Sequence, residues 1–326
     1  MATADQVKAL IKSHAAGDDE RFYAVALQLA AREAQSGHAA YARDLKELVD
    51  TAKRRTLAAS PTPVAVPRGD LASLLAVEYP DERLADLVLD KAIMADLKRV
   101  LLEQRQRDQL RATGFAPLRR LLLLGPPGTG KTMTARVIAG ELHLPLFSVR
   151  LDGLITKFMG ETASKLRIVF DAVAQTPGVY LFDEVDALAG SRTQGNDVGE
   201  IRRVLNSFLQ FMEQDHSDSV IAATSNLPEF LDRALFRRFD ITLNYPMPSG
   251  AVANQVIRNR LTSLNLEKID WRRLVTVSKG LSHAEVTSAA ERAAKEAILS
   301  DVAELTTEHL ITALKMRATV IEPPSA

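Results

Sequence analysis

Apolar and polar positions follow two different periods along this chain, and the change of period divides it into segments. Between residues 3 and 56, apolar residues recur every three or four positions, as in VKALIKSH, FYAVALQLAAREAQ and YARDLKELVDTAKRR. This spacing is typical of amphipathic helices, and the polar stretches GDDE and SGH mark the breaks between them. Residues 1–56 are therefore predicted to form a three-helix bundle.

A stretch rich in proline and small residues follows the predicted bundle. RTLAASPTPVAVPRG contains three prolines and little charge. Such a composition favours an extended, flexible tether over a helix or strand. We therefore expect a linker over 57–69.

From residue 70 to 247, short apolar runs alternate with amphipathic helices. The runs are LRRLLLL, LPLFSVR, GVYLFD, SVIAATSN and DITLNY. Between them lie helices such as EIRRVLNSFLQFM, whose apolar stripe comprises Ile201, Val204, Leu205, Phe208, Leu209 and Met212. Alternation of nearly continuous apolar strands with helices predicts an α/β fold, with a parallel sheet covered by helices on both faces.

The strand signal stops after PMPSG. Residues 248–320 contain AVANQVIRNRL, HAEVTSAAERAAKEAI and TEHLITALKMR, all with helical periodicity. They are predicted to form a small helical subdomain, and residues 321–326 a short tail.

The overall charge is balanced, with 41 basic and 41 acidic residues. No global field therefore attracts nucleic acid or an anionic membrane. The chain has no cysteine, which excludes disulfides and cysteine-bound zinc, and its six histidines show no HExxH spacing. No apolar run matches a membrane span or a signal peptide. We expect a cytoplasmic protein.

A phosphate-binding loop is predicted at GPPGTGKT, Gly125 to Thr132. It follows an apolar run and precedes a helical stretch, which is the context that the pattern requires. The glycines allow backbone N–H groups to surround phosphates, and the helix N-terminus favours negative charge. Lys131 can reach the terminal phosphates and Thr132 can bind magnesium. A glycine-rich turn without a ligand is the less favoured interpretation.

Two acidic residues end the run GVYLFDEVDAL. Asp183 and Glu184 are expected at the carboxyl edge of the sheet, where ligands of such folds bind. Asp183 is predicted to hold magnesium and Glu184 to activate the attacking water. Two acids after a strand are more often a solvated loop, so the phosphate loop decides in favour of function.

At this point residues 80–316 resemble the AAA ATPases, a branch of the AAA+ proteins with a P-loop NTPase fold. SVIAATSN is similar to the strand before the first sensor, with Asn226 at the residue that orients the attacking water. DRALFRRFD is similar to the paired arginine fingers, with Arg237 and Arg238 matching, although a surface salt-bridge cluster with Asp232 and Asp240 is the alternative. The resemblance implies ATP hydrolysis with Mg²⁺ in a homo-oligomeric ring, most often a hexamer.

The resemblance also assigns residues around the nucleotide. LADLVLD resembles the segment along the adenine, and KGLSHAEV resembles the Gly-x-Ser-Gly-Ala-Asp stretch of the helical lid, with His283 in place of glycine. No lid arginine of the second-sensor type is evident. The expected nucleotide-binding residues are Leu87, Val88, Pro126, Pro127, Gly128, Thr129, Gly130, Lys131, Thr132, Met133 and Ala284.

The segment TKFMGET resembles the family's pore loop. Lys157, Phe158 and Met159 would line the central channel of a ring and grip a threaded polypeptide. The alternative is that Phe158 packs beneath its own loop.

The N-terminal bundle resembles, in size and placement, the small interaction domains of microtubule-severing and membrane-remodelling relatives, so residues 1–56 are expected to contact a protein substrate or adaptor, or to help ring assembly.

The leading functional hypothesis is a protein-remodelling ATPase. A regulatory ATPase that controls another protein without threading it, for example a protease in a plasmid-maintenance or phage-defence pair, is the alternative. A nucleic-acid motor is less favoured, because no basic channel loop or DNA-binding domain is visible.

Overall fold

The computed structural model describes residues 69–154, 159–188, 198–231, 233–300 and 304–321, together with a few single positions before residue 69. The chain divides into two compact units, Met1–Pro63 and Val64–Ala326. The predicted three-helix bundle, most of the linker and the tail beyond residue 321 lie outside the described residues. Among the helices that are described, none combines the length and apolar character that a membrane crossing requires.

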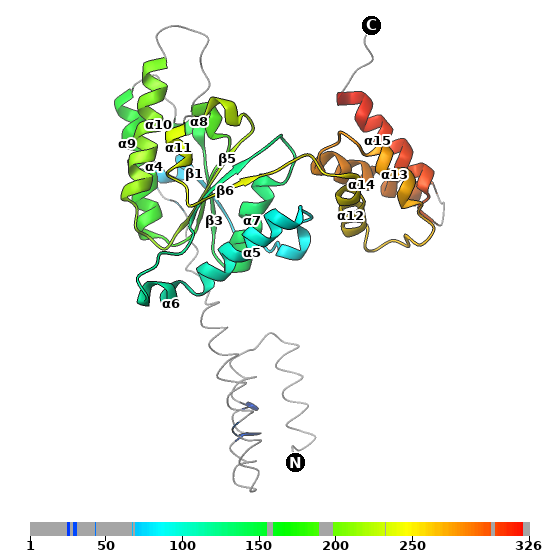
Figure 1. Cartoon of the computed structure of the whole chain (residues 1–326), viewed down its shortest axis with the longest axis horizontal. Coiled ribbons are helices and arrows are strands. Elements are labelled where there is room, and N and C mark those ends of the chain that lie inside the picture. The colour runs from blue at the N-terminus through cyan, green and yellow to red at the C-terminus, as the bar shows by residue number, and fades with distance from the viewer. Residues whose placement is uncertain are drawn as a thin grey trace. The chain divides into compact units, whose positions relative to one another are not determined.

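A six-stranded sheet forms the centre of the second unit (Figure 1). Its strands, in spatial order, are β1 (Leu75–Glu78), β3 (Leu146–Val149), β4 (Val179–Phe182), β5 (Val220–Ser225), β2 (Arg120–Leu124) and β6 (Ile241–Asn244). The five strands predicted from apolar runs pair in parallel, as expected. β1 was not predicted, and it pairs antiparallel with β3 at one edge, so the sheet is mostly rather than wholly parallel. Only its first residue is fully buried, which explains the weak sequence signal.

Helices cover both faces of the sheet (Figure 1). One apolar core joins the sheet to α5 (Lys91–Arg105) and α7 (Lys131–Leu142), and the other joins it to α4 (Asp70–Leu74), α9 (Met159–Gln175) and α10 (Val198–Gln214). In α10 the predicted stripe is buried at Leu205, Phe208, Leu209 and Met212. The shorter helices are α6 (Arg107–Ala112), α8 (Leu151–Leu154) and α11 (Arg233–Phe236), with 3₁₀ turns η1 (Leu84–Asp86), η2 (Val185–Leu188) and η3 (Pro228–Phe230).

Four further helices form the lid, a name used here for residues 250–321. They are α12 (Gly250–Arg260), α13 (Trp271–Val277), α14 (His283–Leu299) and α15 (Thr307–Ile321). They enclose an apolar core of their own, in which α14 presents the small side chains of Ala289, Ala290 and Ala293. Small residues let neighbouring helices approach closely. The helical subdomain predicted to follow the sheet is confirmed.

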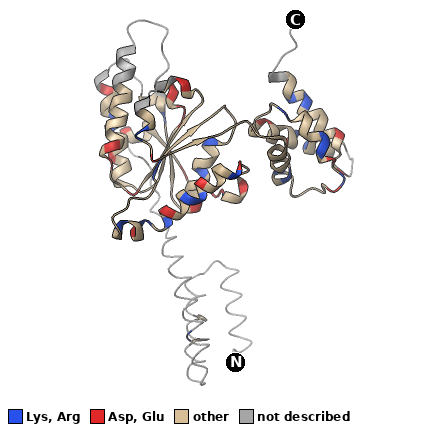
Figure 2. Cartoon of the chain, in the orientation of Figure 1, with Lys and Arg blue, Asp and Glu red and all other residues tan. Residues whose placement is uncertain are grey.

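The segment from Leu87 to Leu89 joins the two cores. Leu87 and Leu89 pack into the core between the sheet and α5 and α7, whereas Val88 packs against the core of the lid. Alternating side chains of an extended segment point to opposite sides, which explains this division. The segment therefore packs against both the core beside the sheet and the core of the lid. Basic and acidic residues are interspersed along the described helices of the lid and of the part that contains the sheet (Figure 2).

Candidate active site

The loop between β2 and α7 is shaped for a phosphate. Gly125 has a φ of 144°, and a Cβ there would lie 2.2 Å from the carbonyl oxygen of Tyr245. Gly130, with a φ of 102°, precedes α7 and provides no side chain to cap the helix. Because the first N–H groups of a helix have no intrahelical acceptor, this uncapped end offers several donors to an anion.

Lys131 opens α7, and its ammonium group bonds to the loop. Its Nζ donates to the carbonyl oxygens of Gly125 (2.7 Å) and Pro126 (2.8 Å). Burial lowers the pKa of Lys131, while the carboxylates of Asp183, Asp186 and Glu184 act in the opposite direction and favour its charged form. The side chain is thus held at the base of the loop by acceptors that a phosphate can replace.

The carboxyl ends of β4 and β5 add a network of oxygen atoms. Thr132 donates to the carboxylate of Asp183, at 3.2 and 3.3 Å. Thr224 of β5 donates to the same carboxylate, and its oxygen accepts the backbone N–H of Glu184 at 2.8 Å. Thr224 thus holds both acidic residues in place, and the sequence motifs did not predict this role. Its position two residues before Asn226 could have indicated it, because alternate residues of a strand lie on the same face.

Glu184 occupies an unusual backbone conformation. Its φ of 57° lies in the left-handed region, which residues other than glycine seldom adopt. Its carboxylate accepts a hydrogen bond from Nδ2 of Asn226 at 3.1 Å, and the N–H of Asn226 donates to Asp186 at 3.2 Å. Strain of this kind is found mainly where surrounding structure enforces a functional geometry. The two residues predicted to handle the attacking water are therefore in direct contact.

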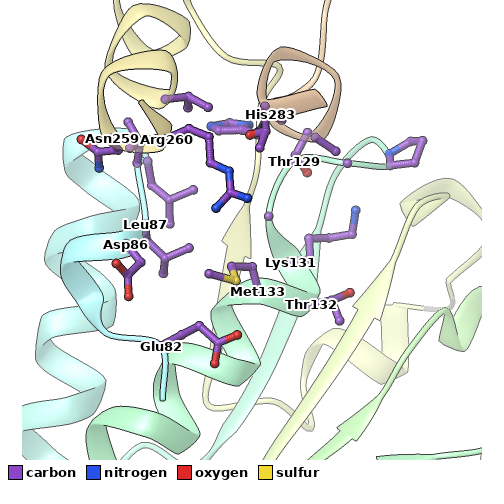
Figure 3. Close-up of a pocket in the computed structure, with 18 of the residues that line it drawn as sticks. Glu82, Asp86, Leu87, Thr129, Lys131, Thr132, Met133, Asn259, Arg260 and His283 are labelled. Atoms are coloured by element: carbon purple, nitrogen blue, oxygen red, sulfur yellow. Dashed lines mark hydrogen bonds between the residues drawn. The ribbon is translucent and has the colours of Figure 1, made fainter. Parts of the chain in front are cut away.

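These groups surround a cavity of about 670 Å³ between the sheet and the lid (Figure 3). Of the residues predicted to bind the nucleotide, all but Pro126 line it; Pro126 instead offers its carbonyl oxygen to Lys131 and Thr129. Asp183, Glu184 and Asn226 also line it. The cavity has further lining residues that were not predicted, namely Glu82, Asp86, Leu89, Val256, Asn259, Arg260, His283 and Thr287.

The start of α14 in the lid contacts the phosphate loop directly. The N–H of Ala284 donates to the carbonyl oxygen of Gly128 at 3.0 Å. Gly128 has a φ of 73°, and a Cβ at this position would lie 2.6 Å from Oγ of Ser282. Ser282 and Glu285 form a capping box at the start of α14, which sets the direction of that helix.

Arg260 is a cation on the lid side of the cavity. It ends α12, its Nε donates to Glu291 of α14 at 2.6 Å, and its guanidinium group points into the cavity (Figure 3). It lies four residues after Val256, which also lines the cavity, so both occupy one face of the helix. Arg260 was not among the predicted site residues; it comes from the end of α12 rather than from the motif at the start of α14, where no second-sensor arginine was evident.

The donor set suits magnesium. Thr132 and Asp183 bring a hydroxyl and a carboxylate oxygen together beside the phosphate loop. Magnesium prefers oxygen ligands and binds through one or two protein groups together with substrate phosphates and water. In the described part of the chain, no cluster of three or more His, Cys, Asp or Glu residues forms a separate metal site.

The remaining predicted residues lie away from the cavity or outside the described residues. Neither Arg237, which is exposed, nor Arg238 lines the cavity of its own chain. Arg238 pairs with Glu213 at the end of α10, whereas Asp240 binds Arg120 at 2.8 and 3.0 Å, so Asp240 is not the partner. Lys157 and Phe158 lie outside the described residues, as does Asp232, and Met159 begins α9. The finger and pore-loop assignments stay predictions.

Comparisons with known proteins agree with this geometry. Residues 121–247 match the family described as "ATPase family associated with various cellular activities (AAA)". An uncharacterized AAA family ATPase, y4kL, from Sinorhizobium fredii is 34% identical over 302 residues, covering 92% of this chain and 90% of the relative. A proteasome-activating nucleotidase from Methanospirillum hungatei is 31% identical over 247 residues. The ATP-dependent zinc metalloprotease FtsH 4 of Sphaerobacter thermophilus is 32% identical over 225 residues.

The extent of these matches differs. The aligned regions cover 73% of this chain and 60% of the nucleotidase, and 67% of this chain and 34% of the metalloprotease. The chain thus spans less than two thirds of either protein. Among solved structures, the crystal structure of the FIGL-1 AAA domain is similar with a TM-score of 0.60 and 24% identity, covering 74% of this chain and 85% of that one. This last likeness concerns the fold alone.

Proposed function

This chain belongs to the AAA family of ATPases, and from that premise we propose that it works as a hexameric ring that remodels or disassembles a protein substrate. The observation that carries the ATP-hydrolysing part of the proposal is the cluster of Thr132, Asp183, Glu184 and Asn226 beside the uncapped start of α7. A phosphate loop, a magnesium ligand set, a base and a polar orienting group are the parts that ATP hydrolysis requires.

Each residue has a distinct part in hydrolysis. The N–H groups of the loop and Lys131 bind the β- and γ-phosphates, since a phosphate replaces the two carbonyl acceptors that Lys131 now contacts. Glu184 accepts the proton of the attacking water, and Asn226 holds that water in line with the γ-phosphate. Magnesium, held by Thr132 and Asp183, would neutralise charge on the phosphates. Thr224 holds Asp183 and Glu184 in position through its two hydrogen bonds.

The position of Arg237 and Arg238 supports a site completed by a second subunit. Neither lines the cavity of its own chain, and Arg237 is exposed. An arginine supplied in trans can raise the rate of phosphoryl transfer by about three to five powers of ten. The proposal therefore requires a ring, in which each protomer completes the site of the next.

Mixing two inactive chains tests this arrangement. We expect an Arg237→Ala/Arg238→Ala chain and a Lys131→Ala chain each to hydrolyse ATP about a thousandfold more slowly than the wild type. In a mixture, intact loops of the first chain meet intact arginines of the second, so phosphate release should recover in part. Absence of recovery would contradict a shared site. So would full ATPase activity of wild-type protein that light scattering shows to be monomeric.

The substrate part of the proposal rests on the motif TKFMGET and on relatives whose names refer to the proteasome and to proteolysis. In a threading machine, Phe158→Ala should retain ATP hydrolysis and lose processing of the protein substrate. In the alternative, a regulatory ATPase that controls a partner such as a protease without threading it, Phe158→Ala should lose neither activity. A pull-down with Glu184→Gln, which should bind ATP without hydrolysing it, would supply the substrate for this comparison.

A further inference from the structure

The turn that follows α11 is anchored in its own chain at three consecutive residues. The N–H of Arg238 donates to the carbonyl oxygen of Leu235 at 3.0 Å, and the side chain of Phe239 is buried in the core beside α9 and α10. The carboxylate of Asp240 accepts two backbone N–H groups where β2 begins, at 3.0 and 2.9 Å. The path of the backbone immediately after Arg237 is therefore fixed.

The side chains of Arg237 and Arg238 differ in their surroundings. Arg238 forms an ion pair with Glu213, near the end of α10, and its Nε is inaccessible to solvent. Of residues 235–240, all of which are described, only Arg237 is exposed, and its side chain makes neither an ion pair nor a hydrogen bond with the rest of the described chain. One of two adjacent arginines is thus held in its own chain, whereas the other is available to a second molecule.

We propose that Arg237 alone reaches the γ-phosphate bound by a neighbouring copy of this chain, and that Arg238 and Glu213 position it without touching that phosphate. The proposal rests on the ring proposed above, because Arg237 needs a neighbouring nucleotide to contact. It differs from the pair of fingers that the family resemblance implies, since one guanidinium group, not two, enters the site of the next protomer. Arg237 is then a catalytic residue, and Arg238 and Glu213 are positioning residues.

The exposure of the ion pair indicates what the pair contributes. The side chains of Arg238 and Glu213 are 40% and 41% exposed, and ion pairs this accessible to solvent add little to stability. A pair beside a catalytic residue can still affect the rate strongly, because a shift of about 1 Å in a reacting group can cost about a hundredfold. If Arg238 acted on the neighbouring phosphate, it would have to leave Glu213 and give up this support for Arg237.

The test measures kcat at saturating ATP and the equilibrium affinity for ATP in full-length variants. Arg237→Ala should lose about three powers of ten in kcat, because the charge that develops on the phosphate loses its cation. Arg238→Gln and Glu213→Gln should each lower kcat about tenfold and leave ATP affinity unchanged, because a displaced Arg237 still acts on the reaction. The double variant should lose no more than either single variant, since both changes remove the same ion pair.

Lysine substitutions separate contact from positioning. A lysine at position 238 keeps an ion pair with Glu213, so Arg238→Lys should stay within about threefold of the wild-type kcat. Arg237→Lys should lose about a hundredfold, because an ammonium group does not reproduce the planar fork that binds phosphate oxygens. Glu308→Gln breaks an exposed pair with Arg273 outside the cavity and is the matched control; it should keep the wild-type kcat.

Two results would overturn the proposal. If Arg238 itself contacts the neighbouring phosphate, Arg238→Gln should be as inactive as Arg237→Ala, while Glu213→Gln keeps or raises kcat. If the ion pair only supports the fold, Arg238→Gln and Glu213→Gln should lower Tm and leave kcat unchanged. If Arg238→Gln does not fold, as judged by circular dichroism, Glu213→Gln decides alone: a tenfold loss supports the proposal and an unchanged kcat overturns it.

Failure of the proposed function gives a different result. The wild type would then hydrolyse no ATP, or a mixture of Arg237→Ala and Lys131→Ala chains would recover no activity. Neither observation depends on Arg238 or Glu213, so the shared site and the division of roles between the two arginines are tested separately.

Discussion

The two ends of the nucleotide cavity differ in how far their polar groups are already paired. At the phosphate end, Lys131, Thr132, Asp183, Glu184 and Asn226 all bond to one another or to the loop. At the lid end, neither ring nitrogen of His283 has a hydrogen bond of ordinary geometry in the described part of the chain, and the guanidinium group of Arg260 points into the cavity while its Nε bonds to Glu291. The phosphate end is thus a connected network before a ligand arrives, whereas the lid end is less completely paired.

This difference separates reaction rate from selectivity. A fixed network lowers the barrier because it needs no rearrangement during the reaction. An incomplete surface contributes binding energy that depends on the ligand's own donors and acceptors. Substitutions at the phosphate end should therefore change turnover, and substitutions at the lid end should change affinity.

The largest expected effect is that of Glu184→Gln. The amide keeps the size of the side chain but cannot accept the proton of water, so kcat should fall by about two to four powers of ten. Affinity for ATP should stay at the wild-type value. Single-turnover hydrolysis and equilibrium binding measure the two quantities. Glu304→Gln, which removes a carboxylate paired with Lys268 outside the cavity, is the matched control for charge removal, and neither its kcat nor its ATP affinity should change.

Thr224→Val tests the support beneath the acidic residues. Valine has the shape of threonine but neither donates to Asp183 nor accepts from the N–H of Glu184. Because groups that orient a metal ligand or base typically contribute ten- to a hundredfold, we expect a decrease in kcat of about that size. Thr319→Val removes an exposed hydroxyl that donates to the carbonyl oxygen of Lys315 within α15, and it should not change kcat. A fall in ATP affinity without a fall in kcat would break the proposed separation of the two ends.

The same contrast explains what could be predicted from the sequence. The phosphate loop, Asp183, Glu184 and Asn226 each follow an apolar strand, so periodicity alone places them at one edge of a parallel sheet. The five parallel strands were found for the same reason, whereas β1 lies at the edge with three half-buried residues and gave little signal. Each of these residues is recognised from the local pattern around it, although the contacts between them join positions 40 to 51 residues apart.

The lid end was not readable in this way. Arg260 and His283 come from different helices, and their approach to Leu87 and Val88 depends on how the lid packs against the sheet. Nothing in the spacing of α12 distinguishes an arginine that points into a cavity from one that points to solvent. His283 was noticed only as a departure from the family's glycine. Its burial is a tertiary property that the sequence does not express.

Arg260→Gln is expected to weaken nucleotide binding moderately. Loss of a cation on the lid side should lower the affinity for ATP by about three- to tenfold, with a smaller effect at high salt, because part of the attraction is screened. The value of kcat at saturating ATP should change little. Arg273→Gln removes a comparable ion pair with Glu308 outside the cavity, and it should leave the affinity unchanged. Equal effects of the two variants would mean that Arg260 acts on lid stability rather than on the ligand.

The smallest expected effect concerns acid stability and the neutral state of His283. Burial lowers the pKa of His283 below its ordinary 6.5, while the backbone of Val88 and then the carboxylate of Asp90 oppose this shift. Burial also raises the pKa of Tyr245, which lines a small second cavity with Asp90 and His283, so Tyr245 stays neutral. Because the unfolded chain then binds this proton more readily than the folded chain, stability falls as the pH drops through 6.5 toward the lower folded value. His283→Gln should remove this loss, so its Tm should fall less than that of the wild type between pH 7.5 and pH 5.5, by about one or two degrees. His216→Gln should follow the wild type. If the two variants respond alike in thermal denaturation, the lid end does not hold a neutral imidazole, and the contrast between the two ends of the cavity loses its main support.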